Sequence, residues 1–330
     1  MKALVLKAIE ELEVSDDLPK PTPSKKEVLI KIKYCGICGS DLEAYKYGKV
    51  LTPLILGHEF SGEIVEVGSK VEGWKIGDRV TSYPADFCGT CHYCSKGQEN
   101  RCRKMVEGLG ISVNGAIAEY VKISSNSLCK LPDSVKYEDA ALVEPLSVGY
   151  HGVKNSGIKP DDNAIVIGAG TIGLSTIQSL KLFNIDNIFI IEPSEFNENL
   201  AIQMGAKKAL RPAKMNKIGP EFVFDCAGFP ETYQNAIQIV QYGGTIILLG
   251  VHFKSVPISF LQVIAKEVTL RGSFGYSFEE FQEVIKFLDQ RKIQTDLIVS
   301  KKVKLENVIK DGFQELLRPD RKSAKILVEI

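Results

Sequence analysis

Residues 35–59 bring two thiols, an imidazole and a carboxylate into one short stretch of the chain. Cys35 and Cys38 are three positions apart, and the pair His58-Glu59 follows about twenty residues later. Zinc accepts Cys sulfur at ~2.3 Å and His nitrogen or carboxylate oxygen at ~2.0–2.2 Å. Each of these residues alone is more often a packing residue, but the glycines beside them let the backbone bend tightly around a ligand. The stretch therefore predicts a catalytic metal site.

A cluster of cysteines follows this stretch. The chain has eight cysteines, and four of them fall within fifteen residues, at Cys88, Cys91, Cys94 and Cys102. In a long chain that we expect to carry no secretory signal, this spacing predicts metal binding rather than disulfides. Four thiolates fill every position around a tetrahedral zinc ion, so this site is predicted to be structural. An iron–sulfur cluster also uses four cysteines, but nothing in the sequence indicates electron transfer.

A glycine-rich turn opens the second half of the chain. The apolar run 164–167 leads into Gly168-Ala-Gly-Thr-Ile-Gly173, and a helical pattern follows over residues 174–183. Such a turn between a strand and a helix lets the backbone approach a pyrophosphate, and the helix N-terminus offers free N–H groups to it. The residues predicted to bind a dinucleotide here are Gly168, Gly170, Thr171, Ile172 and Gly173.

An acidic residue completes this dinucleotide-binding pattern. Glu192 follows the apolar run 188–191, where it is placed to accept hydrogen bonds from the ribose hydroxyls. A 2′-phosphate at that position would meet Glu192, with Glu195 and Glu198 nearby and no arginine before Arg211. The sequence therefore predicts NAD rather than NADP.

Two kinds of domain are needed to position these sites. Residues 1–150 carry short alternating runs separated by Gly and Pro, which are typical of a partly closed β-barrel. Residues 151–290 alternate apolar strands with helical runs, which predicts an α/β fold with a doubly wound parallel sheet, and residues 291–330 are expected to rejoin the first domain. Ligands bind outside the carboxyl ends of such parallel strands. The strand-end residues predicted to lie near a nicotinamide are Gly250, Val251, Ser273 and Phe274.

The composition excludes some classes of partner. Lys plus Arg equals Asp plus Glu, so the formal net charge is zero, which argues against nucleic acid or an anionic membrane surface as the main partner. No apolar run approaches the ~18 residues of a membrane span, and the N-terminal run becomes charged too early for a signal peptide. We expect a cytoplasmic globular protein whose partner is a small molecule.

Taken in their order along the chain, these motifs resemble the zinc-containing medium-chain dehydrogenase (alcohol dehydrogenase) family, and especially its polyol, butanediol and threonine dehydrogenase branch. The resemblance covers nearly the whole chain. It implies a GroES-like catalytic domain built from both chain ends, a Rossmann domain that binds NAD, and two zinc ions per chain, one catalytic and one structural. It also implies a homodimer or homotetramer formed by edge pairing of Rossmann sheets. The matching segments are Cys35-Gly-Ile-Cys38-Gly-Ser-Asp41, Gly57-His-Glu59, the four-cysteine cluster, Glu144-Pro-Leu-Ser147 and the glycine-rich turn.

Carried over residue by residue, the resemblance implies that Cys38, His58 and Glu59 bind the catalytic zinc. It places Glu144 either as a further ligand or as the carboxylate that holds a zinc-bound water. Glu144 precedes a proline in an apolar stretch, and the alternative for it is an exposed acid at a helix end. Cys35 has no ligand role in this pattern.

The resemblance also implies a route for the substrate proton. Ser40 matches the hydroxyl that takes this proton, and Asp41 matches the acid that orients the histidine ligand. Many relatives have a histidine two residues after Asp41, whereas this chain has Glu43. The relay therefore runs through Glu43, or through water and the cofactor ribose.

The implied reaction is hydride transfer between a secondary alcohol, either a polyol or a vicinal diol, and NAD. The alternatives within the family are dehydrogenases of L-threonine or of a sugar-alcohol phosphate. A quinone reductase of the same fold would use NADPH and bind no zinc. A non-enzymatic dinucleotide-binding protein would bind NAD without turnover.

Overall fold

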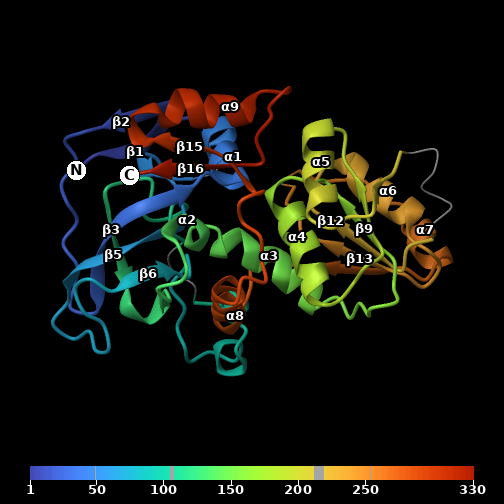
Figure 1. The fold of residues 1–330 in the computed structure, drawn as a ribbon, viewed down its shortest axis with the longest axis horizontal. Helices are drawn as coiled ribbons and strands as arrows, with labels where there is room; N and C mark the ends of the chain where they lie inside the picture. The colour runs from blue at the N-terminus through green and yellow to red at the C-terminus, as the bar shows by residue number, and fades with distance from the viewer. Residues whose placement is uncertain (49, 105–107, 212–218, 253) are drawn as a thin grey trace. The chain divides into compact units, whose positions relative to one another are not determined.

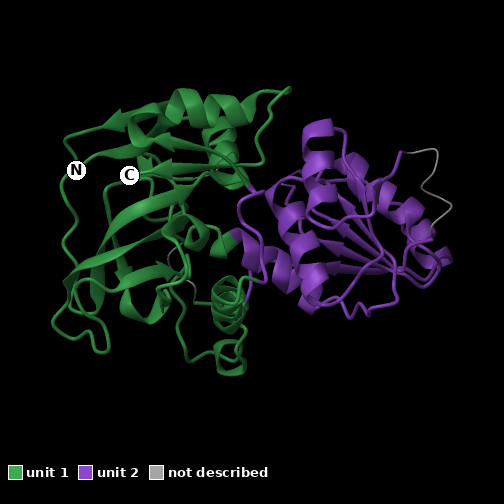
Figure 2. Cartoon of the chain, in the orientation of Figure 1, with its two compact units in different colours: residues 1–144, 277–291, 299–330 green, residues 145–276, 292–298 purple. Residues whose placement is uncertain are grey.

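The computed structural model describes residues 1–330 except 49, 105–107, 212–218 and 253. The described residues form two compact units (Figure 2). The first unit consists of Met1–Glu144, Ser277–Arg291 and Val299–Ile330, and the second of Pro145–Tyr276 and Lys292–Ile298. The domain boundaries predicted at residues 150 and 290 stay a prediction.

The first unit is built mainly from two β-sheets that enclose an apolar core. Strand β16 (Lys325–Glu329) pairs with β3 (Glu27–Gly36), so the C-terminal strand lies directly beside the end of the strand that precedes Cys38. The smaller sheet has the order β2-β1-β4, and the larger has the order β15-β16-β3-β5-β6-β8 with β7 also on β3. The other strands are β1 (Ala3–Ala8), β2 (Glu11–Ser15), β4 (Leu54–Ile55), β5 (Glu59–Val67), β6 (Arg79–Ser82), β7 (Tyr120–Ser124), β8 (Leu128–Lys130) and β15 (Val299–Lys304).

The first unit also contains four α-helices and several single helical turns among its described residues. The α-helices are α1 (Gly39–Tyr47), α2 (Tyr137–Ala140), α8 (Phe278–Asp289) and α9 (Gln314–Leu317). The 3₁₀ turns are η1 (Cys94–Lys96), η2 (Glu99–Arg101), η3 (Ser125–Ser127) and η5 (Leu305–Asn307), and η6 (Val308–Phe313) is a π-helical turn. The unit is therefore rich in β-strands, as the sequence predicts.

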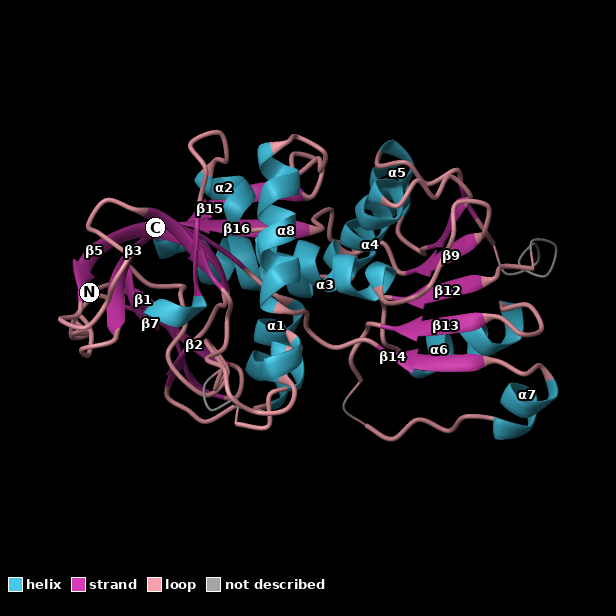
Figure 3. Cartoon of the chain, turned by 90° about the horizontal axis from the view of Figure 1, so that it is seen from below, coloured by secondary structure: helices cyan, strands magenta, loops and turns pink. Residues whose placement is uncertain are grey.

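The second unit is a doubly wound parallel sheet, as predicted (Figure 3). Its strand order is β11-β10-β9-β12-β13-β14, which places the glycine-rich turn after the central strand β9 (Ala164–Ile167). Helices α4 and α5 cover one face of this sheet, and α6 and α7 cover the other (Figure 1). The other strands are β10 (Ile188–Ile191), β11 (Lys208–Ala209), β12 (Phe222–Asp225), β13 (Thr245–Leu248) and β14 (Thr269–Gly272), and the helices are α4 (Thr171–Leu182), α5 (Glu195–Gln203), α6 (Pro230–Ile239), α7 (Phe260–Ala265) and most of α3 (Val143–Lys154).

The core of the second unit follows from its sequence pattern. All four residues of β9 are buried, as the uninterrupted apolar run predicts for a strand that has helices on both faces. The register pairs Ile191 of β10 with Ile167 of β9, so both strands end at the same edge of the sheet. Among the described residues, no helix is both long and apolar enough to cross a membrane.

Candidate active site

The pairing of two strands brings the predicted catalytic ligands together. Gly36, at the end of β3, lies opposite Glu59, the first residue of β5. Cys38 follows two residues after Gly36, and His58 immediately precedes Glu59. As a result, the ligand atoms of Cys38, His58 and Glu59 all lie within 4.8 Å of one another.

Asp41 fixes the backbone of both ligand segments. Its carboxylate is almost fully buried in the first turn of α1. Oδ2 accepts a hydrogen bond from the backbone N–H of Cys38 at 2.8 Å, and Oδ1 accepts one from the backbone N–H of Gly57 at 3.1 Å. Burial raises the pKa of Asp41, against which the nearby His58 charge acts. The family resemblance implies that Asp41 orients the histidine ring, and in the structure Asp41 holds the backbone of Cys38 and of Gly57, the residue before His58.

His58 has one ring nitrogen that the described residues leave without a partner. The residue is buried, and its Nδ1 has no hydrogen-bond partner among the described residues. Burial acts to lower the pKa of His58, but the Cys38 sulfur, Asp41 and Glu144 together hold it well above the usual value. A buried imidazole nitrogen without a partner, beside a thiol and a carboxylate, is a donor set of the kind that zinc binds. The residues present therefore fit a zinc ion.

Glu59 has a buried cation as its partner, which the sequence reasoning missed. Lys325 Nζ donates to both carboxylate oxygens of Glu59 at 2.7 and 2.6 Å, and to the carbonyl of Ile37 at 2.9 Å. The Lys325 side chain is 2% exposed and that of Glu59 is 1% exposed. A Cβ on Gly36 would lie 2.1 Å from Glu59 Oε2, so only glycine leaves room for this ion pair. The available signal was a lone lysine that opens a strand of apolar residues.

The other residues assigned to the reaction surround this group less closely. Ser40 is exposed in the first turn of α1, and Glu43 is half-buried one turn later. Glu144 is half-buried in the first turn of α3, and its charge contributes to raising the pKa values of His58 and Lys325. Cys35 is fully buried, and burial raises the pKa of its thiol well above the usual value.

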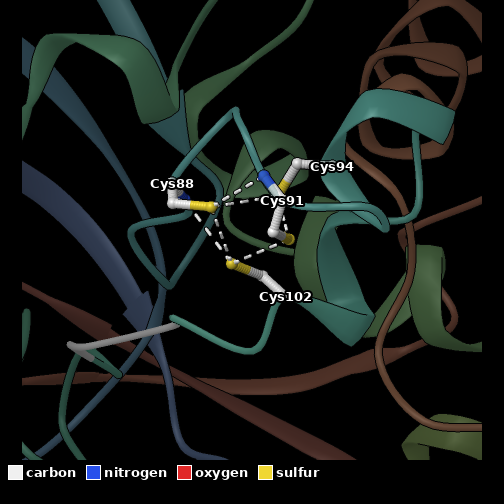
Figure 4. A group of neighbouring side chains, drawn as sticks. All are labelled: Cys88, Cys91, Cys94 and Cys102. Atoms are coloured by element: carbon white, nitrogen blue, oxygen red, sulfur yellow. Dashed lines mark hydrogen bonds between the residues drawn. The ribbon is translucent and has the colours of Figure 1, made fainter.

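The cysteine cluster forms a compact group of four sulfur atoms (Figure 4). The Sγ atoms are 3.6 Å apart for Cys88–Cys102 and Cys91–Cys94, 3.9 Å for Cys88–Cys94, and 4.0 Å for Cys91–Cys102. Sulfur atoms that surround one zinc ion tetrahedrally at ~2.3 Å lie about 3.8 Å from each other. These spacings therefore fit one closed zinc site. His92 stacks edge-on against Tyr93 and is not part of the group.

The cysteine loop is attached to helix α8. Glu99, which lies between the third and fourth cysteines, accepts a hydrogen bond at 3.0 Å from the backbone N–H of Phe278, the first residue of α8. Phe87, next to the first cysteine, packs against the ring of Phe278 with a centroid separation of 5.6 Å. A metal that holds this loop would therefore also support the start of α8.

The glycine-rich turn has the geometry that a dinucleotide needs. Gly168 has φ of +86°, a conformation that side chains with a Cβ rarely adopt. A Cβ on Gly173 would lie 1.9 Å from the carbonyl oxygen of Gly168, whereas a Cβ on Gly170 would meet nothing within 4 Å. Gly170 is the N-cap of α4, and Thr171 and Ile172 form its first turn. Gly173 is thus required by the fold, while Gly170 leaves open space above the helix N-terminus.

Glu192 is held against this turn. Its Oε2 accepts a hydrogen bond from the backbone N–H of Ala169 at 2.6 Å, and its Oε1 accepts one from Ser194 at 2.8 Å. The residue is 7% exposed. The carboxylate is therefore fixed at the carboxyl edge of the sheet, beside the helix N-terminus that would face a pyrophosphate.

The four strand-end residues differ in their surroundings. Gly250 is needed for a close approach of two loops, because its Cβ would lie 2.2 Å from the backbone nitrogen of Gly228. Val251 and Phe274 are exposed. Ser273 follows β14, and its buried Oγ has no hydrogen-bond partner among the described residues.

The sequence matches two protein families. Residues 24–133 match the alcohol dehydrogenase GroES-like domain, and residues 171–290 match the family described as zinc-binding dehydrogenase. Sorbitol dehydrogenase from Bacillus subtilis (strain 168) is 32% identical over 344 residues, which cover 99% of this chain and 97% of that protein. The crystal structure of 2R,3R-butanediol dehydrogenase from Bacillus subtilis is similar with a TM-score of 0.90 and 32% identity, covering 100% of this chain and 99% of that one.

Two further solved structures differ in the cofactor that they contain. A short chain alcohol dehydrogenase from Escherichia coli CFT073, complexed with NADH, has a TM-score of 0.92 and 27% identity. A zinc-binding dehydrogenase from Sinorhizobium meliloti 1021, bound to NADP, has a TM-score of 0.90 and 29% identity. Each alignment covers 100% of this chain and 99% of the other.

Proposed function

Because the chain belongs to the zinc-binding alcohol dehydrogenase family, we propose that it transfers hydride between a polyol or vicinal diol and NAD. The observation that carries this proposal is the buried set of Cys38, His58 and Glu59, whose ligand atoms lie within 4.8 Å of one another. The relatives named sorbitol dehydrogenase and butanediol dehydrogenase support the substrate class. Each name describes a secondary alcohol that has a hydroxyl on the neighbouring carbon.

Cys38 and His58 would hold a catalytic zinc, with Glu59, Glu144 or both completing the set. Bound there, zinc would supply a Lewis acid that lowers the pKa of an alcohol hydroxyl, and NAD would supply the acceptor for hydride. A second zinc would be held by the four cysteines of the loop at 88–102, where four thiolates leave no open position. That ion would be structural.

Ser40 and Glu43 would move the substrate proton. They are three residues apart on α1 and therefore share one face of the helix. The exposed Ser40 hydroxyl accepts the alcohol proton, and the Glu43 carboxylate receives it from Ser40 and releases it to water. Lys325 supplies a buried counter-charge to the Glu59 carboxylate.

The second unit would bind NAD at its glycine-rich turn. The pyrophosphate would lie over Gly170 and the N-terminus of α4, where a Cβ would find open space. Glu192 would accept hydrogen bonds from the adenosine ribose. Ser273, whose buried Oγ has no hydrogen-bond partner among the described residues, would be a further contact for the cofactor.

A homo-oligomer would form through the edge of the parallel sheet. Strand β14 ends the sheet and is largely exposed, and an unpaired edge can accept a second strand. Phe260, Leu261 and Ile264 of the neighbouring α7 are 66%, 76% and 71% exposed. A second copy of the chain would cover these apolar side chains. The cysteine cluster needs a reducing compartment to bind metal, which favours the cytoplasm.

The test is a screen for NADH formation with purified zinc-loaded protein over 2,3-butanediol, sorbitol, xylitol, galactitol, inositol, threonine and their phosphates. We expect turnover with diols or polyols and its loss when a chelator removes the catalytic zinc. Turnover only with threonine would identify the protein as a threonine dehydrogenase, and turnover only with a phosphate would identify it as a sugar-alcohol-phosphate dehydrogenase. Quinone reduction with NADPH that persists in the chelated protein would overturn the proposal.

A further inference from the structure

Cofactor choice depends on side chains at one edge of the parallel sheet. Strands β10 and β11 run parallel, with Ile190 opposite Ala209, so the residues that follow them emerge at the same edge. Glu192 follows β10, and Arg211 lies two residues beyond the end of β11. The sequence alone separates these two residues by nineteen positions, but the fold places them side by side: Arg211 Nη1 donates to the carbonyl oxygen of Glu192 at 3.2 Å.

A guanidinium beside the ribose-binding carboxylate would ordinarily attract a 2′-phosphate. Arginine binds phosphate through two parallel N–H groups and is always charged, so a free arginine here would favour NADP. The Arg211 side chain is 59% exposed, and it contacts the backbone carbonyl of Glu192 and the carboxylate of Glu198. NAD has no 2′-phosphate, so an enzyme that uses NAD has no phosphate for an arginine at this position to bind.

Glu198 occupies that arginine. Its Oε2 lies 2.6 Å from Arg211 Nη2, and its own side chain is only 17% exposed. Glu198 lies in the first turn of α5, where the helix dipole favours a carboxylate. The helix therefore favours the charged Glu198 carboxylate at this position, and Arg211 forms an ion pair with it.

The Glu192 carboxylate is held by contacts other than Arg211. Both of its carboxylate oxygens already accept backbone N–H groups, from Ala169 and Ser194. In the described part of the chain, Arg211 bonds to the backbone carbonyl of Glu192, and its ion pair is with Glu198. Glu192 and Glu198 therefore differ in their contacts: the Glu192 carboxylate binds the glycine-rich turn, and the Glu198 carboxylate binds Arg211.

We infer that Glu198 is a specificity-determining residue: by pairing with Arg211 it withholds from a 2′-phosphate the arginine that the fold places beside Glu192. This inference rests on the proposed function, since it concerns how the dinucleotide site prefers NAD. Glu192 repels the phosphate, and Glu198 removes the residue that would compensate for that repulsion.

The test compares the binding of NADH and NADPH to the zinc-loaded protein, measured by cofactor fluorescence in the absence of alcohol. Glu198→Gln keeps the shape of the side chain but releases Arg211. We expect NADPH affinity to rise about fivefold, as for a newly available charge-assisted phosphate contact, with NADH affinity changed by less than about twofold. Adding Arg211→Gln to this variant should abolish the gain, and raising the salt concentration should reduce it.

Glu195→Gln is the matched control. Glu195 is exposed in the same turn of α5, and it forms no hydrogen bond or ion pair with Arg211 in the described part of the chain. Its substitution removes one nearby negative charge without releasing the arginine. Equal NADPH gains in Glu195→Gln and Glu198→Gln would overturn the inference while leaving the NAD proposal intact. Tighter binding of NADPH than NADH by the wild type, or binding of neither, would instead overturn the proposed cofactor and this inference with it.

Discussion

Glu59 is the residue at which the candidate metal site and the fold are most closely joined. Its carboxylate can serve as a zinc ligand, yet in the structure both oxygens accept from Lys325, a residue 266 positions away in the sequence. A charge this deeply buried needs a partner of opposite sign, because leaving it alone in the interior is costly. The ion pair therefore holds the C-terminal strand β16 against the segment that carries the ligands.

Replacing Lys325 with methionine should destabilise the protein strongly. Glu59 would keep its buried position and lose its counter-charge, and breaking a buried pair in this way costs about 3–5 kcal/mol in the free energy of unfolding. The double variant Glu59→Gln/Lys325→Met removes both charges and should recover most of that loss. Urea unfolding followed by circular dichroism measures the difference.

Lys302→Met supplies the comparison for this prediction. Lys302 pairs with Glu138 at the surface, where its side chain is 46% exposed, and such pairs contribute at most about 1 kcal/mol. Lys325→Met would contradict the account if it unfolded at the same urea concentration as Lys302→Met.

Pairs of residues that lie far apart in the sequence, such as Glu59 and Lys325, cannot be predicted from either residue alone. The ligands Cys38, His58 and Glu59 could be proposed because short local motifs carry them. Lys325 could not, since nothing local tells a lysine in an apolar strand which residue faces it. Arg211 was set aside for the same reason, because its distance along the chain from Glu192 hides their contact.

At the scale of elements, the glycine-rich turn separates a residue required by the fold from one required by the ligand. Gly173→Ala should lower stability, because its Cβ would overlap the carbonyl oxygen of Gly168. Gly170→Ala should leave stability within about 1 kcal/mol of wild type, as expected for a site with ordinary backbone angles and open space. Its NADH affinity should nevertheless fall at least about tenfold, since the methyl group would occupy the place of the pyrophosphate.

Thermal unfolding and NADH titration on the two variants check this prediction together. A Gly170→Ala variant that binds NADH as tightly as the wild type would show that the pyrophosphate does not lie over this residue.

The elements that could be predicted are those with a regular pattern. The short runs of alternating apolar and polar residues predict the strands of the first unit. The apolar runs that end in glycine predict the strands of the parallel sheet. Helix α8 was missed although Ser277 and Glu280 form a capping box at its start, with Glu280 N donating to Ser277 Oγ at 3.1 Å. Residues 305–317 form no single regular helix: they are a 3₁₀ turn, a π-helical turn and the short α9. Gly312 lies in the π-helical turn, where a Cβ would lie 2.7 Å from Ile37, so tertiary packing alters the local geometry.

At the scale of the whole molecule, the cysteines divide into reactive and unreactive classes. Burial raises the pKa of Cys129 and of Cys226 to about 12, so both are protonated at neutral pH. Hydrogen bonding, first from the backbone N–H of Thr90, lowers the pKa of Cys88 to about 6, against which its partial burial acts. Since the thiolate is the form that reacts, Cys88 should be the more reactive at neutral pH once metal is absent.

Alkylation with iodoacetamide should therefore depend on metal. In the zinc-loaded protein the four cysteines of the loop should be protected, and after chelation Cys88 should be labelled well before Cys129 and Cys226. Mass spectrometry of peptides at successive times gives the order. Labelling of Cys129 ahead of Cys88, or labelling of the loop at the same rate with and without metal, would contradict a structural zinc at this position.

The proposed activity requires a metal with an open coordination position as well as the closed one in the cysteine loop. Cys38 contributes to the first and lies outside the second, so one substitution can separate them. Zinc content, NADH binding and alcohol oxidation should therefore be measured on the same preparations of wild-type protein and Cys38→Ser. We expect two zinc ions per wild-type chain, and in the variant one zinc, unchanged NADH binding and no alcohol oxidation. Alcohol oxidation by Cys38→Ser at the wild-type rate would contradict the account.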